Sequence, residues 1–185
     1  MKRKNKVVRI GVSIVCMAVL TAALLWCATA ARQAVFNSFE QPVEGLPEIV
    51  SKTAIFTDEQ AAISVVESCA DAQGNVIAYR VQTAVTGYNS EVPIKLAITV
   101  SSDTTVLRGI EVLSQKESEY YGARIKESSF KERFKDRVLP MYLTGEAGRG
   151  SHVDGIAGAT VTSQAVVKAV NDIAAFVQEK YIQAE

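Results

Sequence analysis

The residues best suited to chemistry lie in one short stretch, residues 154–163, which reads DGIAGATVTS. Its glycines and alanines leave the backbone open to a ligand, and three hydroxyl groups follow, on Thr160, Thr162 and Ser163. A helix is expected to begin near Thr162, and a helix N-terminus presents unpaired N–H groups and a partial positive charge. Such an arrangement can bind a phosphate group, and a hydroxyl beside it can be phosphorylated or esterified.

A second interpretation of the same hydroxyls needs no ligand. Thr162 or Ser163 would then accept hydrogen bonds from N–H groups in the first turn of the helix, as ordinary capping residues do. The stretch lacks the Gly-Lys-Ser/Thr of a Walker loop and the G-x-G-x-x-G order of a dinucleotide-binding turn. Spacing alone therefore leaves both interpretations open.

Composition excludes several classes of protein. The 185 residues include 20 basic and 20 acidic side chains, one His and three Cys. A balanced charge argues against a broadly basic nucleic-acid-binding protein. One His and three Cys are too few for a dedicated zinc cluster or a disulfide scaffold, so neither a metal site nor a nucleic-acid partner is expected.

The N-terminal residues predict a membrane anchor. Residues 1–9 carry five basic side chains and no acid, and residues 10–31 carry no charge. As a helix the uncharged run spans about 33 Å, enough for a hydrocarbon core of about 30 Å. The basic flank places residues 1–9 in the cytoplasm and the rest of the chain outside, as a single-pass protein of the cell membrane. Residues 28–30 (ATA) also fit a signal-peptide cleavage site, but the long apolar run favours a retained anchor.

Residues 32–56 are expected to form a stalk, because prolines and a glycine interrupt regular secondary structure there. The elements that position the hydroxyls follow this stalk. Residues 57–185 are expected to form one domain. Residues 57–60 (TDEQ) read as a capping box, which predicts a helix to about Ala70. Strands are expected at residues 76–85, 94–100 and 106–113, paired in an antiparallel sheet.

The second half of the domain is expected to be mainly helix and loop. Ser128 or Ser129 is expected to cap a short helix that runs through Phe134, and residues 139–152 read as a loop. A last helix is expected over residues 162–181, because apolar residues recur there at helical spacing. This order of elements predicts an α+β domain.

Residues 154–163 resemble the signature of the covalent FMN-binding domain family, approximately Asp-x-x-Ser/Thr-Gly-Ala-Thr-x-Thr/Ser-Ser. In that family the Thr after Gly-Ala carries FMN as a phosphoester on its hydroxyl, and the matching residue here is Thr160. Ala157 stands where the family usually has Ser or Thr. The resemblance implies that further residues of the signature help to bind the cofactor, namely Asp154, Gly155, Gly158, Ala159, Thr162 and Ser163.

The resemblance extends upstream of this signature. Residues 117–122 (ESEYYG) correspond to the family's Glu-Thr-Pro-Gly-Leu-Gly segment, which adds Glu117, Tyr121 and Gly122 to the implied cofactor-binding residues. Tyr121 or Tyr120 is expected to stack on the isoalloxazine ring. Gly87-Tyr88 before a strand also resembles the family pattern. Within the family the chain is most similar to the G subunits of Rnf-type complexes, and it is related to the C subunits of Na⁺-pumping NADH:quinone oxidoreductases.

The resemblance implies a flavoprotein electron-transfer subunit of a membrane-bound, ion-translocating ferredoxin:NAD oxidoreductase. Its partners would be the other membrane subunits of an Rnf-type complex, and an FMN transferase would attach the cofactor. Two alternatives remain: an exported scaffold without redox chemistry, and a stand-alone FMN-dependent reductase of an extracytoplasmic acceptor. The sequence contains no acid–base pair arranged for a substrate, which favours an electron carrier over an enzyme acting alone.

Overall fold

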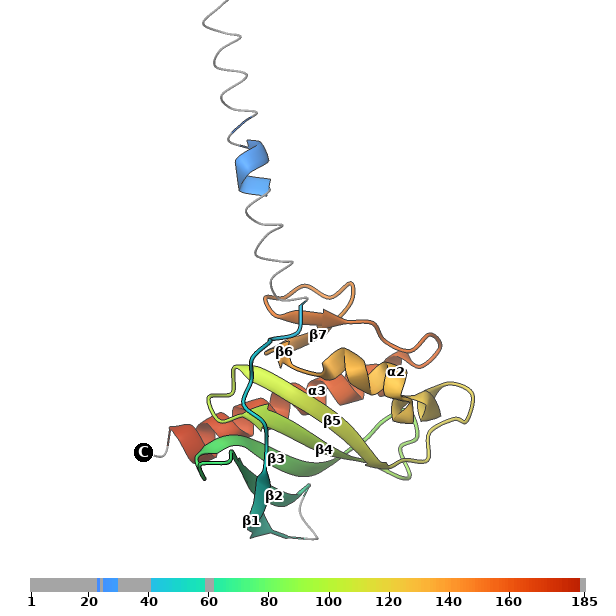
Figure 1. Ribbon diagram of the computed structural model, residues 1–185. Helices are drawn as coiled ribbons and strands as arrows, with labels where there is room; N and C mark the ends of the chain where they lie inside the picture. The colour runs from blue at the N-terminus through green and yellow to red at the C-terminus, as the bar shows by residue number, and fades with distance from the viewer. Residues whose placement is uncertain (1–22, 24, 30–40, 59–61, 184–185) are drawn as a thin grey trace, which may run out of the picture. The chain divides into compact units, whose positions relative to one another are not determined.

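The computed structural model describes residues 23, 25–29, 41–58 and 62–183 (Figure 1). The chain divides into two units, Met1–Ser38 and Phe39–Glu185. The described residues of the first unit are helical. No helix in the described part of the chain is both long and apolar enough to cross a membrane. The predicted anchor, residues 10–31, falls largely outside the described residues and stays a prediction.

The second unit is built on an antiparallel sheet in which each strand pairs with the next one along the chain (Figure 1). Over the described residues its six strands are β1 (Ser51–Thr57), β2 (Ile63–Ala70), β3 (Val76–Val85), β4 (Ile94–Ser101), β5 (Val106–Ser114) and β6 (Arg137–Val138). The sequence predicted strands at residues 76–85, 94–100 and 106–113, and the structure confirms them as β3, β4 and β5.

Helices and a second, small sheet complete the domain. After β5 come η1 (Gly122–Lys126), α2 (Ser128–Lys131) and η2 (Glu132–Phe134), and the chain ends with α3 (Thr160–Val177) and η3 (Gln178–Ile182). Between them β7 (Met141–Leu143) and β8 (Ser151–Val153) form a parallel pair. The helix α3 packs against β7, β3 and β4. The domain is therefore α+β, as the sequence predicts.

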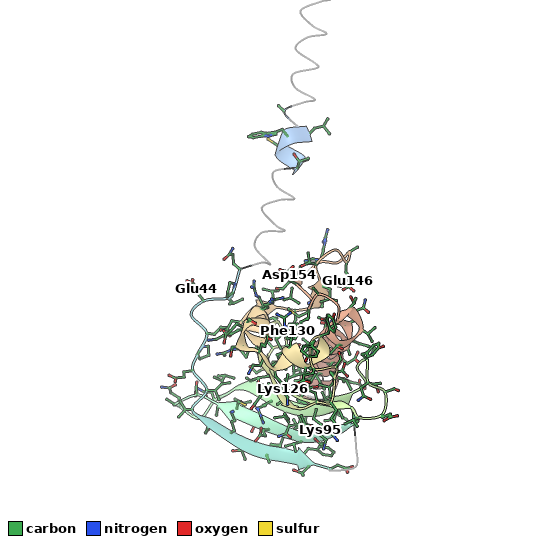
Figure 2. All side chains as sticks on the ribbon, turned by 90° about the vertical axis from the view of Figure 1, so that its right-hand side faces the viewer. Glu44, Lys95, Lys126, Phe130, Glu146 and Asp154 are labelled. Carbon is green, nitrogen blue, oxygen red and sulfur yellow. The ribbon has the colours of Figure 1, made fainter. Side chains whose placement is uncertain are left out.

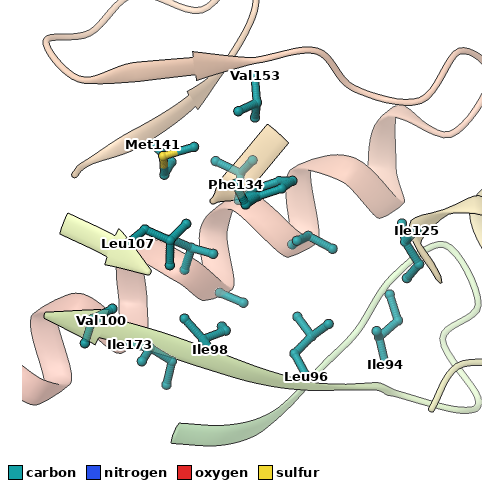
Figure 3. Packing of buried hydrophobic residues seen from close by; sticks show 14 of the residues in the cluster. Ile94, Leu96, Ile98, Val100, Leu107, Ile125, Phe134, Met141, Val153 and Ile173 are labelled. Carbon is teal, nitrogen blue, oxygen red and sulfur yellow. The ribbon is translucent and has the colours of Figure 1, made fainter. Parts of the chain in front are cut away.

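The core lies between the sheet and α3. Alternate residues of β4 are fully buried on one face, as expected for a strand with one face toward the core. Figure 3 shows Leu96 and Ile98 on the sheet side of this core, with Met141 and Val153 on the opposite side. The buried stripe of α3 recurs every three or four residues and consists of Val166, Val170, Ile173 and Val177. This packing fixes α3, and with it the N-terminus of α3, relative to the sheet.

Three expectations about local structure were wrong. The helix predicted from residue 57 to Ala70 is instead the strand β2, which hydrogen-bonds to both β1 and β3. Its β-branched residues Ile63, Val65 and Val66 suit a strand, and their partly helical spacing is outweighed by pairing with β3. The predicted loop, residues 139–152, contains β7 and most of β8. The short helix α2 has Glu127 at its N-cap, in place of Ser128 or Ser129.

The domain also begins earlier than residue 57. Residues 51–57 form β1 at the free edge of β2. Before it, the Val43 N–H donates to the Asp136 carbonyl at 2.6 Å, and an Arg108 Nη2–H donates to the Pro47 carbonyl at 3.0 Å. The described part of the predicted stalk is thus packed on the domain, because its backbone supplies partners to β2 and to Arg108.

Candidate functional site

The helix α3 begins at Thr160, two residues earlier than expected. Its N-cap residue is Ala159, which has φ −132° and ψ 45° and offers no side-chain capping hydrogen bond. Thr160 is therefore the first helical residue. No capping side chain accepts a hydrogen bond from the N–H groups of the first turn, which point out of the end of the helix. An 18-residue helix carries a partial positive charge at this end.

The three hydroxyls of the signature have different environments. The Thr162 side chain is 1% exposed, and its hydroxyl donates to Glu117 Oε2 at 2.6 Å. The Ser163 side chain is fully buried, and its hydroxyl accepts the Ile156 N–H at 3.0 Å. Neither bond is made to an N–H of the first helical turn, so the simple capping interpretation was wrong. Thr160, in contrast, is exposed.

The Glu117 carboxylate accepts hydrogen bonds from two segments that are distant in the sequence. Glu117 is 7% exposed, and its carboxylate accepts the backbone N–H groups of Tyr88 and Asn89, each at 3.1 Å, besides the Thr162 hydroxyl. Its own N–H donates to the side-chain oxygen of Gln115. The carboxylate thus joins the loop after β3, the segment after β5 and the first turn of α3.

Two glycines let the chain approach this carboxylate closely. A Cβ placed on Gly87 would lie 2.5 Å from Glu117 Oε1, and one on Gly122 would lie 2.7 Å from Glu117 Cβ. Real Cβ atoms do not come so near to such atoms, so both positions require glycine while Glu117 keeps its place. The sequence singled out Glu117 and Gly122 by resemblance alone, and the structure places them in direct contact.

Thr160 lies at an open pocket of about 460 Å³. Residues from the α3 N-terminus and the two loops form its lining, namely Tyr88, Ser118, Tyr121, Gly158, Ala159, Thr160, Val161 and Thr162. The ring of Tyr121 lies over Gly158, where a Cβ would come within 2.6 Å of Tyr121 Cδ1, and Gly158 has a positive φ of 78°. Tyr88 and Tyr121 are 72% and 53% exposed, so two aromatic faces are available at this pocket.

Asp154 lies apart from the Thr160 pocket. Its Oδ1 accepts the Thr144 hydroxyl at 2.8 Å, and its carbonyl accepts an Arg133 Nη1–H at 2.7 Å. It lines a separate pocket together with His152, on the side of the domain away from the sheet (Figure 2). Gly155 lies beside Ser163, with the Cβ position 3.3 Å from Ser163 Cβ. These residues shape the loop that leads to Thr160, and the structure does not bring them into its pocket.

Sequence reasoning missed some of the pocket. Tyr88, Ser118 and Val161 were not among the predicted site residues, although all three line it. The sequence signal for this part of the pocket is the Gly87-Tyr88 pair, which resembles the family pattern. Tyr120 was an equal candidate to Tyr121 for stacking, but it is 82% exposed and is not part of the lining.

Together, the sheet, the buried Glu117 and the exposed Thr160 at the start of α3 define an α+β cofactor-binding domain. Residues 87–175 match the FMN-binding domain family. The chain is 29% identical, over 96% of its length and 97% of the other, to the G subunit of an ion-translocating oxidoreductase complex from Methanosarcina acetivorans. The fold resembles the C subunit of the Na⁺-translocating NADH-quinone reductase from Parabacteroides distasonis, with TM-score 0.50 and 24% identity over 62% of each chain.

Proposed function

We propose that this chain is the flavoprotein electron-carrier subunit of a membrane-bound, ion-translocating oxidoreductase complex of the Rnf type, with FMN esterified to Thr160. The observation that carries the proposal is the accessibility of the hydroxyls. Thr162 and Ser163 are buried and already hydrogen-bonded, whereas Thr160 is exposed at the rim of an open pocket. The match of residues 87–175 to the FMN-binding domain family supports the choice of cofactor.

The residues around Thr160 fit an FMN group. The pocket volume of about 460 Å³ lies within the range of about 300–1,000 Å³ that is usual for small-molecule sites. Tyr88 and Tyr121 offer aromatic faces to a planar ring, and Gly158 leaves the approach to Thr160 free of a side chain. The N-terminus of α3 would stabilise the remaining negative charge of a phosphodiester by about 0.3–1 kcal/mol.

Attachment needs a hydroxyl and an activated phosphate. Thr160 Oγ1 would form the new P–O bond, a phosphoanhydride bond in the flavin donor would break, and the hydroxyl proton would leave with the departing fragment. A separate FMN transferase would supply this donor. Once bound, FMN supplies reversible electron transfer, while the chain sets its position and surroundings. A covalent ester also prevents loss of the cofactor by dissociation.

The proposal includes the predicted topology. Residues 10–31 would anchor the chain with residues 1–9 in the cytoplasm, and the flavin domain would lie outside the cytoplasm beside other membrane subunits of the complex. The relative from Methanosarcina acetivorans, which matches over nearly its whole length, is named as one subunit of an ion-translocating complex, and this supports such partners.

Intact mass of the full chain, produced with and without a co-expressed FMN transferase, tests the attachment. We expect one added FMN phosphoester in the wild type, and none in Thr160→Val. The same spectra show whether the N-terminal segment is retained. Unmodified wild-type protein in the presence of an active transferase would overturn the proposed attachment, and an adduct that persists in Thr160→Val would move it to another residue.

A further inference from the structure

We propose that Glu117 is a positioning residue that assembles the Thr160 pocket without itself contacting the flavin. The inference rests on the proposed function, since it assigns to Glu117 a role in FMN attachment. Glu117 is not part of the pocket lining, whereas three residues connected to it are: Tyr88, Ser118 and Thr162. The carboxylate therefore lies behind the pocket wall and acts through the residues in front of it.

The first argument is the way in which the carboxylate is coordinated. Its two oxygens accept three hydrogen bonds from two distant segments, at 3.1, 3.1 and 2.6 Å. Within the described residues Glu117 takes part in no salt bridge, so dipolar donors surround the charge. Loss of any of these hydrogen bonds would destabilise the fold, because a buried polar group without a partner raises the free energy of the folded state.

The second argument is steric. Gly87 and Gly122 bring backbone against the Glu117 side chain from two sides, and neither has room for a Cβ. Ser118 follows Glu117 directly, and Tyr88 follows Gly87, so movement of the carboxylate would move two walls of the pocket. Its bond to Thr162 ties those walls to the helical turn that begins with Thr160. The geometry of the acceptor hydroxyl and of the pocket therefore depends on one side chain.

The domain provides a matched control at the other end of β4. The carboxylate of Asp103 also accepts a hydroxyl, from Ser101 at 2.5 Å, and a backbone N–H, from Thr105 at 3.1 Å. Ser101 ends β4, whereas the Glu117 cluster lies where β4 begins, at Ile94. Asp103→Asn thus makes the same chemical change as Glu117→Gln, a carboxylate to a carboxamide, away from the Thr160 pocket.

The experiment compares full-length wild type, Glu117→Gln, Thr162→Val and Asp103→Asn. Hydrogen exchange of the cofactor-free chains reports the Tyr88 and Asn89 amides, and timed intact mass with the transferase and its flavin donor reports the rate of FMN addition. A carboxamide has one acceptor oxygen, so Glu117→Gln leaves an amide of the loop unpaired. We expect exchange at Tyr88–Asn89 and the time needed for FMN addition each to rise about tenfold, and Asp103→Asn to change neither.

The outcomes separate this inference from the proposed function. Unchanged exchange in Glu117→Gln overturns the positioning role, as does faster exchange with FMN addition at the wild-type rate. A melting temperature lowered equally in Glu117→Gln and Asp103→Asn, with FMN addition slowed equally in both, also overturns it. If Glu117→Gln does not fold, Thr162→Val decides, since it removes one of the two donors to Glu117 Oε2, the Thr162 hydroxyl, and keeps the carboxylate. If the wild type accepts no FMN, the proposed function fails while the exchange result still decides whether Glu117 positions the loop.

Discussion

The hydroxyl of Thr162 donates a 2.6 Å hydrogen bond to the carboxylate of Glu117, 45 residues earlier in the chain. The two residues come from the two segments, residues 117–122 and 154–163, in which the sequence predicted cofactor-binding residues. Their bond joins two motifs that are separated in the chain by three short helices and by the strands β6, β7 and β8. It also removes Thr162 from the set of free hydroxyls and leaves Thr160 exposed beside it.

Replacement of Thr162 by Val is expected to destabilise the domain by about 1.5–3 kcal/mol, because a buried bond to a charged acceptor is lost. Thr83→Val is the matched control: Thr83 is 7% exposed, and its hydroxyl donates to the neutral carbonyl of Ala62 at 3.1 Å. That bond should contribute about 0.5–1.5 kcal/mol. Urea denaturation of the full-length chain in detergent measures both changes. An equal or smaller loss for Thr162→Val would contradict the prediction.

Gly158→Ala is expected to cost more than Gly145→Ala. Both glycines have positive φ, 78° and 96°, so both substitutions carry a backbone cost of about 1–2 kcal/mol. Only at Gly158 does the new Cβ meet another group, at 2.6 Å from Tyr121 Cδ1, whereas Gly145 has nothing within 4 Å. Displacement of the Tyr121 ring should add about 1 kcal/mol or more.

A double-mutant cycle tests the cause of this difference. In a Tyr121→Ala background the extra cost of Gly158→Ala should disappear, because the ring is no longer there, and the cost of Gly145→Ala should stay the same. Urea denaturation gives all the free energies. If Gly158→Ala keeps its full cost without the Tyr121 ring, contact with Tyr121 is not the reason for glycine at this position.

The sequence predicted those parts of the fold that have a simple local pattern. Alternation in β4 and helical spacing in α3 identified both elements, because each has one face toward the core. The strand β2 was missed because Ala62, Val65, Val66 and Cys69 also fit a helical stripe, and only the edge of β3 decides between the two. The N-terminus of α3 was placed two residues late, at Thr162, and neither the Thr162 nor the Ser163 hydroxyl caps it, since both form hydrogen bonds elsewhere.

For the site, the sequence provided residue types but not their arrangement. Thr160 was identified by its place in a motif, and its exposure depends on where the neighbouring hydroxyls find partners. Glu117 was identified by resemblance, and its contact with Thr162 joins segments whose approach local patterns do not encode. Asp154 matched the motif equally well, yet it binds Thr144 and lines a different pocket. Long-range packing therefore decides which motif residues meet.

Ionisation of Asp103 should make the stability of the domain depend on pH in the acid range. Although burial opposes ionisation, hydrogen bonds from Ser101 and Thr105 lower the pKa of this carboxyl below its ordinary value of 3.8. A carboxyl with a lowered pKa in the folded state stabilises the fold above the unfolded pKa, and this contribution is lost as the pH falls through the lower, folded pKa. The stabilisation due to Asp103 should thus be complete near neutral pH and decline below about pH 3.8.

The measurement is the melting temperature of wild type and Asp103→Asn between pH 7 and pH 2.5. The wild type should be the more stable at neutral pH, and the difference should shrink as the pH is lowered below about 3.8, because the amide does not titrate. Other carboxyls contribute to both proteins alike and cancel in the comparison. A difference that stays constant across this range would show that ionisation of Asp103 does not stabilise the fold.

Removal of the Tyr121 ring should change the emission of a flavin at Thr160. Tyr121 lines the pocket, and its phenol can donate an electron to an excited flavin in contact with it, which quenches fluorescence. Full-length Tyr121→Ala that carries FMN is therefore expected to fluoresce more brightly per flavin than the wild type. Tyr120→Ala is the matched control, since Tyr120 is the adjacent residue, is 82% exposed and lies outside the lining. Equal emission from wild type and Tyr121→Ala, at equal flavin content by mass, would exclude ring contact between Tyr121 and the flavin.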